Sequence, residues 1–213
     1  MTFDSLVERV GVLPWFDLAT VLQLSGEPRA TALNQLSRFA RAGKIVPLRR
    51  GMYVLAERYR RTAVQPAALA NALYRPSYLS GAWALSFYGL IPEGAPVFTS
   101  VTTRSPKRFE NAFGEFEYRN VKRPLFFGST FVRIGGEQAL VAAPEKALVD
   151  LWHLSRGEWT EARMREMRPA QNERLDPAKL ESLVLRLGSP RISRAFAMWS
   201  RVVAEDGEGE VTL

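Results

Sequence analysis

Apolar residues near the N-terminus recur at intervals of three and four, which is the spacing of a helix with one buried face. The pattern predicts a first helix that ends near Val12 and is capped by Thr2 or Asp4. It predicts a second helix over about residues 15–24. The positions expected to be buried on the second helix are Trp15, Leu18, Val21 and Leu22. Gly26 suits a C-cap, so a short break follows this helix.

A third helix, predicted from about Pro28 to Ala42, has two different sides. Its apolar stripe consists of Leu33, Leu36, Phe39 and Ala40. Its other side carries Arg29, Thr31, Asn34, Gln35, Arg38 and Arg41. Side chains of these types pair with base edges and phosphates: arginine with guanine, and asparagine or glutamine with adenine. Two helices joined by a short glycine-containing turn, the second of them basic, match a helix-turn-helix.

A hairpin is predicted directly after the basic helix. Residues 44–48 and 52–55 have strand composition, and Gly51 suits a turn with positive φ. Arg49 and Arg50 would lie at the tip, in reach of the DNA backbone or the minor groove. The predicted phosphate contacts are Arg29, Arg41, Lys44, Arg49 and Arg50, and base contacts are expected among Thr31, Asn34, Gln35 and Arg38. The order of these elements predicts a winged helix-turn-helix.

The remainder of the chain contains segments with the two-residue alternation of strands and segments with the three-to-four-residue spacing of helices. Strands are predicted over about residues 77–79, 97–101, 115–119, 131–134 and 138–141, and helices over about residues 66–73, 81–88, 144–152, 159–167, 176–187 and 190–203. Ser80 is a candidate N-cap for a helix that has no polar face and is expected to be buried. The fold class is therefore α+β, with a winged helix-turn-helix over residues 1–61 and a C-terminal α+β domain over residues 62–204. The acidic, glycine-rich residues 205–213 are expected to be a flexible tail.

Charge is distributed unevenly along the 213 residues, whose formal net charge is +7. Residues 1–28 have a net charge of −3, residues 29–61 of +8 and residues 62–213 of +2. The excess is thus concentrated in the predicted basic helix, the hairpin and the segment after it. Such asymmetry indicates a polyanionic partner for this segment.

Several functions are excluded or disfavoured by what the sequence lacks. It has no cysteine and a single histidine, His153, so disulfides, thiolate metal sites and multi-histidine sites within one chain are excluded. It has no phosphate-loop or dinucleotide fingerprint, and we expect neither a metal nor another cofactor. We read no signal peptide, and the longest charge-free stretch, residues 76–92, is shorter than the roughly 20 residues of a membrane span. A cytoplasmic protein without membrane contact is expected.

Four segments, in this order, resemble the AbiEi-type antitoxins. They are residues 36–53, LSRFARAGKIVPLRRGMY; residues 78–92, YLSGAWALSFYGLIP; residues 102–109, TTRSPKRF; and residues 143–150, APEKALVD. The resemblance covers roughly residues 15–155. It implies a transcriptional repressor that is also the antitoxin of a type IV toxin–antitoxin pair and that represses its own operon. It also implies a nucleotidyltransferase-like toxin encoded nearby, whose effect is countered without the need for a stable complex. The expected DNA partner is a double-stranded operator that contains an inverted repeat.

Two further groups of residues are candidates for function. Arg104, Lys107 and Arg108 could form a second DNA-binding patch, joined by Arg119, Lys122 and Arg123 if the loops meet in space. Glu145, Lys146, Asp150 and His153 lie on one predicted helix. Its i,i+4 and i,i+3 spacings put the last three on one face, as a surface ion pair or as an acid–base site.

The leading interpretation is a DNA-binding repressor and antitoxin that is not an enzyme. Two alternatives remain open: an enzyme that uses the helix over residues 145–153 and is positioned on nucleic acid, and a module that binds the toxin directly.

Overall fold

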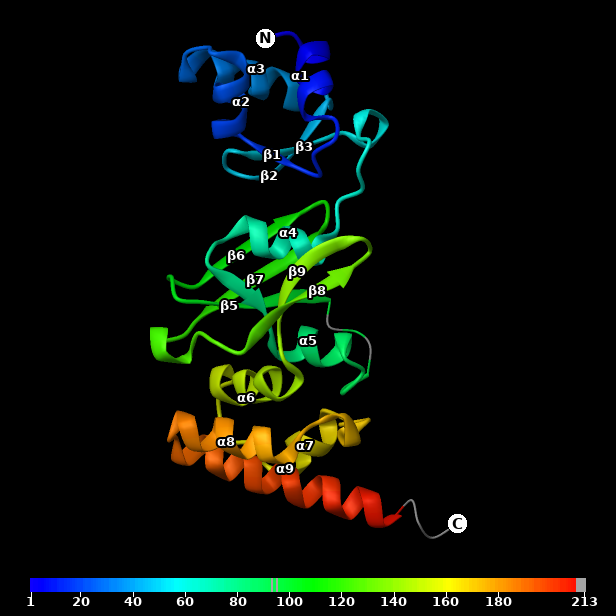
Figure 1. The fold of residues 1–213 in the computed structure, drawn as a ribbon, viewed down its shortest axis with the longest axis vertical. Coiled ribbons are helices and arrows are strands. Elements are labelled where there is room, and N and C mark those ends of the chain that lie inside the picture. The colour runs from blue at the N-terminus through cyan, green and yellow to red at the C-terminus, as the bar shows by residue number, and fades with distance from the viewer. Residues whose placement is uncertain (93, 95, 210–213) are drawn as a thin grey trace.

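The structure is a computed structural model that describes residues 1–92, 94 and 96–209. It is a mixed α+β fold, elongated, with its elements in successive tiers (Figure 1). The N-terminal helices and a small sheet occupy one end, a six-stranded sheet lies in the middle, and the C-terminal helices occupy the other end. The predicted α+β class is confirmed.

The N-terminal tier contains three helices and a three-stranded sheet. Its elements are α1 (Phe3–Val10), β1 (Phe16–Asp17), α2 (Leu18–Ser25), α3 (Arg29–Arg41), β2 (Ile45–Arg49) and β3 (Met52–Leu55), and the strand order is β1-β3-β2. The predicted hairpin is present, and Gly51 in its turn has a φ of 76°. A small apolar core joins the helices to the sheet; its most buried members include Leu6, Val10, Phe16, Val21, Leu36 and Ile45.

Two expectations for this tier were wrong in detail. The second helix begins at Leu18 rather than near residue 15, because Phe16 and Asp17 pair with β3 and Asp17 then caps the helix. The Asp17 Oδ1 atom accepts a bond of 2.8 Å from the backbone N–H of Thr20. Leu33 is 37% exposed, and Ala32 is buried instead, so the apolar stripe of α3 is narrower than expected.

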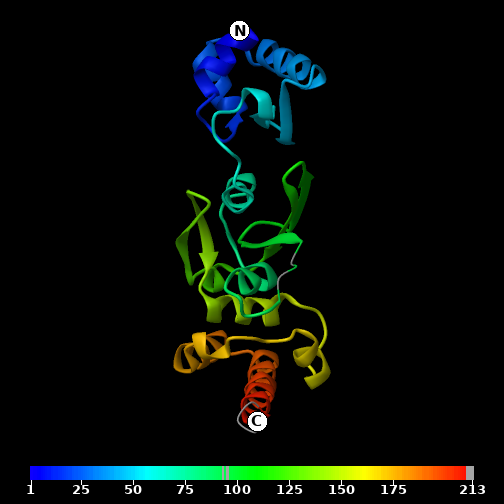
Figure 2. The ribbon, with the colours of Figure 1, turned by 90° about the vertical axis from the view of Figure 1, so that its right-hand side faces the viewer.

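The central sheet has the strand order β6-β7-β5-β4-β9-β8. Its strands are β4 (Ser77–Leu79), β5 (Val97–Thr102), β6 (Lys107–Asn111), β7 (Gly114–Asn120), β8 (Ser129–Ile134) and β9 (Glu137–Ala142). The β5–β7 and β4–β9 pairs are parallel, and the other neighbours are antiparallel. The sheet curves around α4 (Pro66–Leu73) on one side, while α5 (Gly81–Phe87) and α6 (Pro144–Leu154) cover the other side (Figure 2).

Strand β6 is the main element that the sequence pattern did not reveal. Residues 104–108 read as a turn-rich loop, yet Lys107 and Arg108 begin an edge strand paired with β7. Backbone hydrogen bonds to β7 stabilise this strand, and its polar side chains give no pattern from which the strand could be predicted. Helix α5 also differs from expectation: Phe87 is 39% exposed, and Ser80 makes no capping hydrogen bond.

The C-terminal tier consists of α7 (Glu161–Glu166), α8 (Pro177–Leu187) and α9 (Pro190–Gly209). Short 3₁₀ turns lie at Glu57–Tyr59, Arg123–Leu125 and Asn172–Arg174. The expected flexible tail, residues 205–213, begins as helix, because α9 continues to Gly209; residues 210–213 lie outside the described part of the chain. Across the described ranges, no helix is both long and apolar enough to cross a membrane.

A large apolar core joins the sheet, its helices and one face of the N-terminal hairpin. Leu48, Met52 and Val54 of the hairpin are buried together with residues of α4 and the central sheet. Asn111 Nδ2 donates to the carbonyl of Leu48 at 3.2 Å, and the Arg60 guanidinium lies 5.4 Å from the centre of the Phe113 ring. The hairpin is therefore anchored on the body of the molecule.

Candidate nucleic-acid interface

The solvent-facing side of α3 is basic and has no carboxylate. Its exposed predicted contacts are Arg29, Thr31, Asn34, Arg38 and Arg41, and we call this set the α3 face. Packing of Ala32 and Leu36 into the small core turns these side chains outward. Arg41 Nη2 donates to Ser37 Oγ at 3.1 Å, and no ion pair involves the α3 face within the described residues. The arginine charges are thus free to meet a polyanion.

Two predicted contacts do not belong to the α3 face. Gln35 is half-buried, and its Oε1 atom is buried without a hydrogen-bond partner. The pKa of Glu27 is lowered by a hydrogen bond from the N-terminal ammonium and by one from Gln35, so Gln35 is turned inward. Lys44 is also half-buried, with Nζ 4.6 Å from the centre of the Phe3 ring. This contact holds Lys44 beside α1.

The two hairpin arginines differ in their surroundings. Arg50 is exposed in the turn. Arg49 is half-buried: its Nε atom is buried without a partner, and Nη1 donates to the Arg50 carbonyl at 3.1 Å. The pKa of Asp17 is lowered, mainly by the backbone hydrogen bond from Thr20, and the charge of Arg49 adds to this effect. Arg50 is therefore the better placed of the two to contact a ligand.

Basic side chains continue from α3 to the central sheet through two hollows that share Arg49 and Arg50. The first, of about 480 Å³, lies between α3, the start of α2 and the hairpin, and Arg29 also lines it. The second, of about 390 Å³, lies between the hairpin, the end of α4 and β6. Its other cationic residues are Arg75, Arg104 and Lys107. We call this second hollow, with its five cationic residues, the junction hollow.

The predicted second patch is thus divided between two surfaces. Arg104 lies in the junction hollow, where its guanidinium stacks 4.4 Å from the centre of the Tyr74 ring and donates to the Arg75 carbonyl at 3.1 Å. Lys107 lines this hollow and also a larger groove, which Arg108 and Arg119 share. Lys122 and Arg123 are exposed but line neither. Arg75 was missed, because an arginine before proline carries no binding signal by itself.

Lys146 and Asp150 form a buried ion pair, not a surface one. Their side chains are 1% and 2% exposed, and the Lys146 Nζ atom bonds to Asp150 Oδ1. Nζ also donates to Tyr78 OH at 2.9 Å, while Tyr78 OH and Ser80 Oγ donate to Asp150 Oδ2 at 3.1 and 2.8 Å. These four residues, which we call the β4–α6 clamp, explain why Ser80 does not cap α5.

Burial disfavours the charged forms of both Lys146 and Asp150 in the clamp. It raises the pKa of Asp150 and lowers the pKa of Lys146, and the attraction between the two charges acts against each shift. Burial, and then the Asp150 charge, raise the pKa of Tyr78, so its hydroxyl stays protonated and can donate. The clamp joins residues 78–92 to residues 143–150. The four-residue spacing signalled the ion pair, but only the fold adds Tyr78 and Ser80.

The other residues of the predicted helix do not converge on the clamp. Glu145 is buried and pairs with Lys179 of α8 at 2.6 Å, and it accepts a bond from the Asp176 backbone N–H. His153 is half-buried, and burial lowers its pKa. No hydrogen bond joins its ring to the clamp within the described residues. Nor does that part of the chain contain a group of three or more histidine and acidic residues suited to a metal ion.

The comparisons with known proteins found no matching family model and no matching curated protein.

Proposed function

We propose that this protein is a DNA-binding transcriptional repressor of its own operon and the antitoxin of a type IV toxin–antitoxin pair. In this proposal, α2, α3 and the β2–β3 hairpin form a winged helix-turn-helix. Helix α3 enters the major groove, and Arg50 contacts the backbone beside it. The observation that carries the proposal is the α3 face, an exposed set of base-reading and cationic side chains on a helix without a carboxylate.

The contacts divide between specificity and affinity. Thr31, Asn34 and Arg38 are of the types that read base edges, whereas Arg29, Arg41 and Arg50 are phosphate contacts. The junction hollow extends the phosphate-binding surface from the hairpin onto the second domain. Because the hairpin is anchored in the large core, the two surfaces keep a fixed relation. The full chain therefore protects a longer stretch of DNA than residues 1–61 alone would contact.

The test is a gel-shift titration over a range of salt concentrations, with the DNA that precedes the protein's own reading frame and a scrambled duplex. Arg38→Ala weakens binding to the specific duplex by about 1–3 kcal/mol and reduces discrimination. Arg50→Ala weakens binding to both duplexes and lowers the salt slope by about 1. Arg133→Ala, an exposed arginine on the far edge strand β8, is the matched control. Unchanged binding in both test variants contradicts the proposal.

The antitoxin half of the proposal needs a separate experiment. It rests on the resemblance, which covers segments of both domains, and on the β4–α6 clamp that joins two of these segments. A nucleotidyltransferase-like gene next to the reading frame supplies the toxin to be co-expressed. We expect Arg38→Ala to relieve repression of a reporter and still to protect cells from that toxin. If Arg38→Ala abolishes both repression and protection, the antitoxin activity depends on DNA binding and the two activities are not separable.

A further inference from the structure

A second basic surface lies away from α3 and shares Lys107 with the junction hollow. It is a groove of about 850 Å³ between the edge of the central sheet and the end of α6. Its cationic residues are Lys107, Arg108, Arg119, Arg156 and Arg163, and Glu117 is the one carboxylate in its lining. The excess of positive charge, reduced by one because Arg108 pairs with Glu115 outside the lining, selects an anionic ligand.

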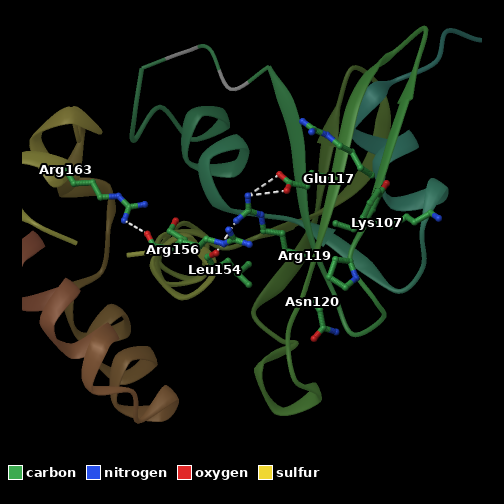
Figure 3. Close-up of a pocket in the computed structure, with 11 residues that line it drawn as sticks. Lys107, Glu117, Arg119, Asn120, Leu154, Arg156 and Arg163 are labelled. Atoms are coloured by element: carbon green, nitrogen blue, oxygen red, sulfur yellow. Dashed lines mark hydrogen bonds and ion pairs between the residues drawn. The ribbon is translucent and has the colours of Figure 1, made fainter. Parts of the chain in front are cut away.

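The cationic side chains of this groove are partly held in place and partly unpaired. Arg163 stacks 4.0 Å from the centre of the Trp159 ring. Its Nη1 donates to the Arg156 carbonyl at 2.7 Å (Figure 3). Lys107 and Arg156 have no carboxylate partner within the described residues. Arg119 lies between Glu117 and the carbonyl of Leu154, to which Nη1 donates at 3.1 Å (Figure 3). Lys107 and Arg156 therefore stay available for phosphate oxygens, and Arg163 keeps the donors that the Arg156 and Glu158 carbonyls do not use.

A small pocket adjoins the groove, and Arg119, Leu154 and Ser155 line both. Its volume is about 160 Å³. Gly81, Ala82, Val101 and Leu151 supply apolar walls, and Ser80, Thr99 and Asp150 supply polar atoms on the same lining. A cavity of about 150 Å³ is known to admit benzene, so this pocket fits a single aromatic ring. Apolar walls with a polar edge suit a heteroaromatic base better than a sugar covered with hydroxyls.

We infer that the groove and the pocket together bind a pyrimidine nucleoside triphosphate. The base occupies the 160 Å³ pocket, and the phosphates lie along the groove, against Arg119, Arg156 and Arg163. The second ring of a purine needs more volume than the single ring of a pyrimidine, so the pocket favours a pyrimidine base. The inference does not depend on the α3 face, since none of these residues belongs to it, and Lys107 is the one lining residue that the groove shares with the junction hollow.

The experiment is calorimetric titration of the full chain with CTP, UTP, ATP and inorganic triphosphate. We expect CTP or UTP to bind at least about tenfold more tightly than ATP and inorganic triphosphate. Ala82→Leu, which fills the pocket, weakens pyrimidine nucleotide binding to the level of inorganic triphosphate and leaves inorganic triphosphate unchanged. Arg156→Ala removes a charge-assisted contact and weakens every ligand by about tenfold. Thermal melting confirms that each variant is folded, and Arg133→Ala is the control.

The outcomes separate the parts of the inference. If inorganic triphosphate binds as tightly as the nucleotides, or if Ala82→Leu changes nothing, the pocket does not hold a base and the inference is wrong. If ATP binds as well as CTP, the single-ring argument is wrong. The same chemistry occurs in free pyrimidine nucleotides and at the 5′ ends of RNA. A 5′-triphosphorylated RNA that starts with a pyrimidine distinguishes these two ligands. Binding tighter than that of CTP assigns the site to RNA ends, and weaker binding assigns it to free nucleotides.

Discussion

Removing the Asp150 carboxylate is expected to destabilise the protein far more than removing a carboxylate at the surface. The side chain is 2% exposed and accepts bonds from Lys146, Tyr78 and Ser80. Asp150→Ala leaves an ammonium group buried without its counter-charge. Breaking a buried ion pair in this way costs about 3–5 kcal/mol.

The loss translates into a measurable change in melting temperature. For a protein of this size, each kcal/mol lowers Tm by roughly 2–4 °C, so Asp150→Ala lowers Tm by about 6–20 °C. Circular dichroism melting and urea titration measure the change. The matched control is Glu115→Ala, which breaks the exposed pair with Arg108, whose side chains are 44% and 64% exposed. That change costs under about 1 kcal/mol.

A double variant tests the cause of the destabilisation. Lys146→Met/Asp150→Leu removes both charges and keeps much of the volume, so it recovers most of the loss caused by Asp150→Ala. Two results would refute the reasoning. One is an Asp150→Ala variant that is no less stable than Glu115→Ala, and the other is a double variant that is no better than the single one.

Two smaller predictions concern pH and helix capping. Because burial lowers the pKa of His153 in the folded state, the unfolded state binds more protons below pH about 6.5, and stability falls as the pH falls through that value. His153→Gln flattens this part of the pH–stability curve, and an NMR titration of the single histidine showing a pKa at or above about 6.5 would oppose the explanation. Asp17→Ala removes the cap of α2 and lowers stability by about 1 kcal/mol in urea titration, whereas Asp17→Asn keeps the acceptor and most of the stability.

Local patterns were sufficient for most of the secondary structure. Helix α3, the hairpin with its turn at Gly51 and α6 were predicted close to their observed bounds, because periodicity, glycine and proline act over a few residues. Strand β6 was not predicted, because an edge strand is stabilised by hydrogen bonds to β7 and needs no apolar alternation. Pairing between β1 and β3 likewise shortened α2 at its start.

The sequence by itself determined the chemistry available to this protein: one concentrated stretch of positive charge, no cysteine, one histidine, and a basic helix followed by a hairpin. Only the tertiary structure decided how that chemistry is arranged. It turned Gln35 inward, left Arg49 half-buried, anchored the hairpin on the large core, and buried Lys146 with Asp150. It also brought Arg75, Arg104 and Lys107 to the hairpin, and placed a ring-sized pocket beside Arg119. The physical reason is that charge and residue type belong to the chain, whereas exposure and proximity depend on contacts between residues distant in sequence.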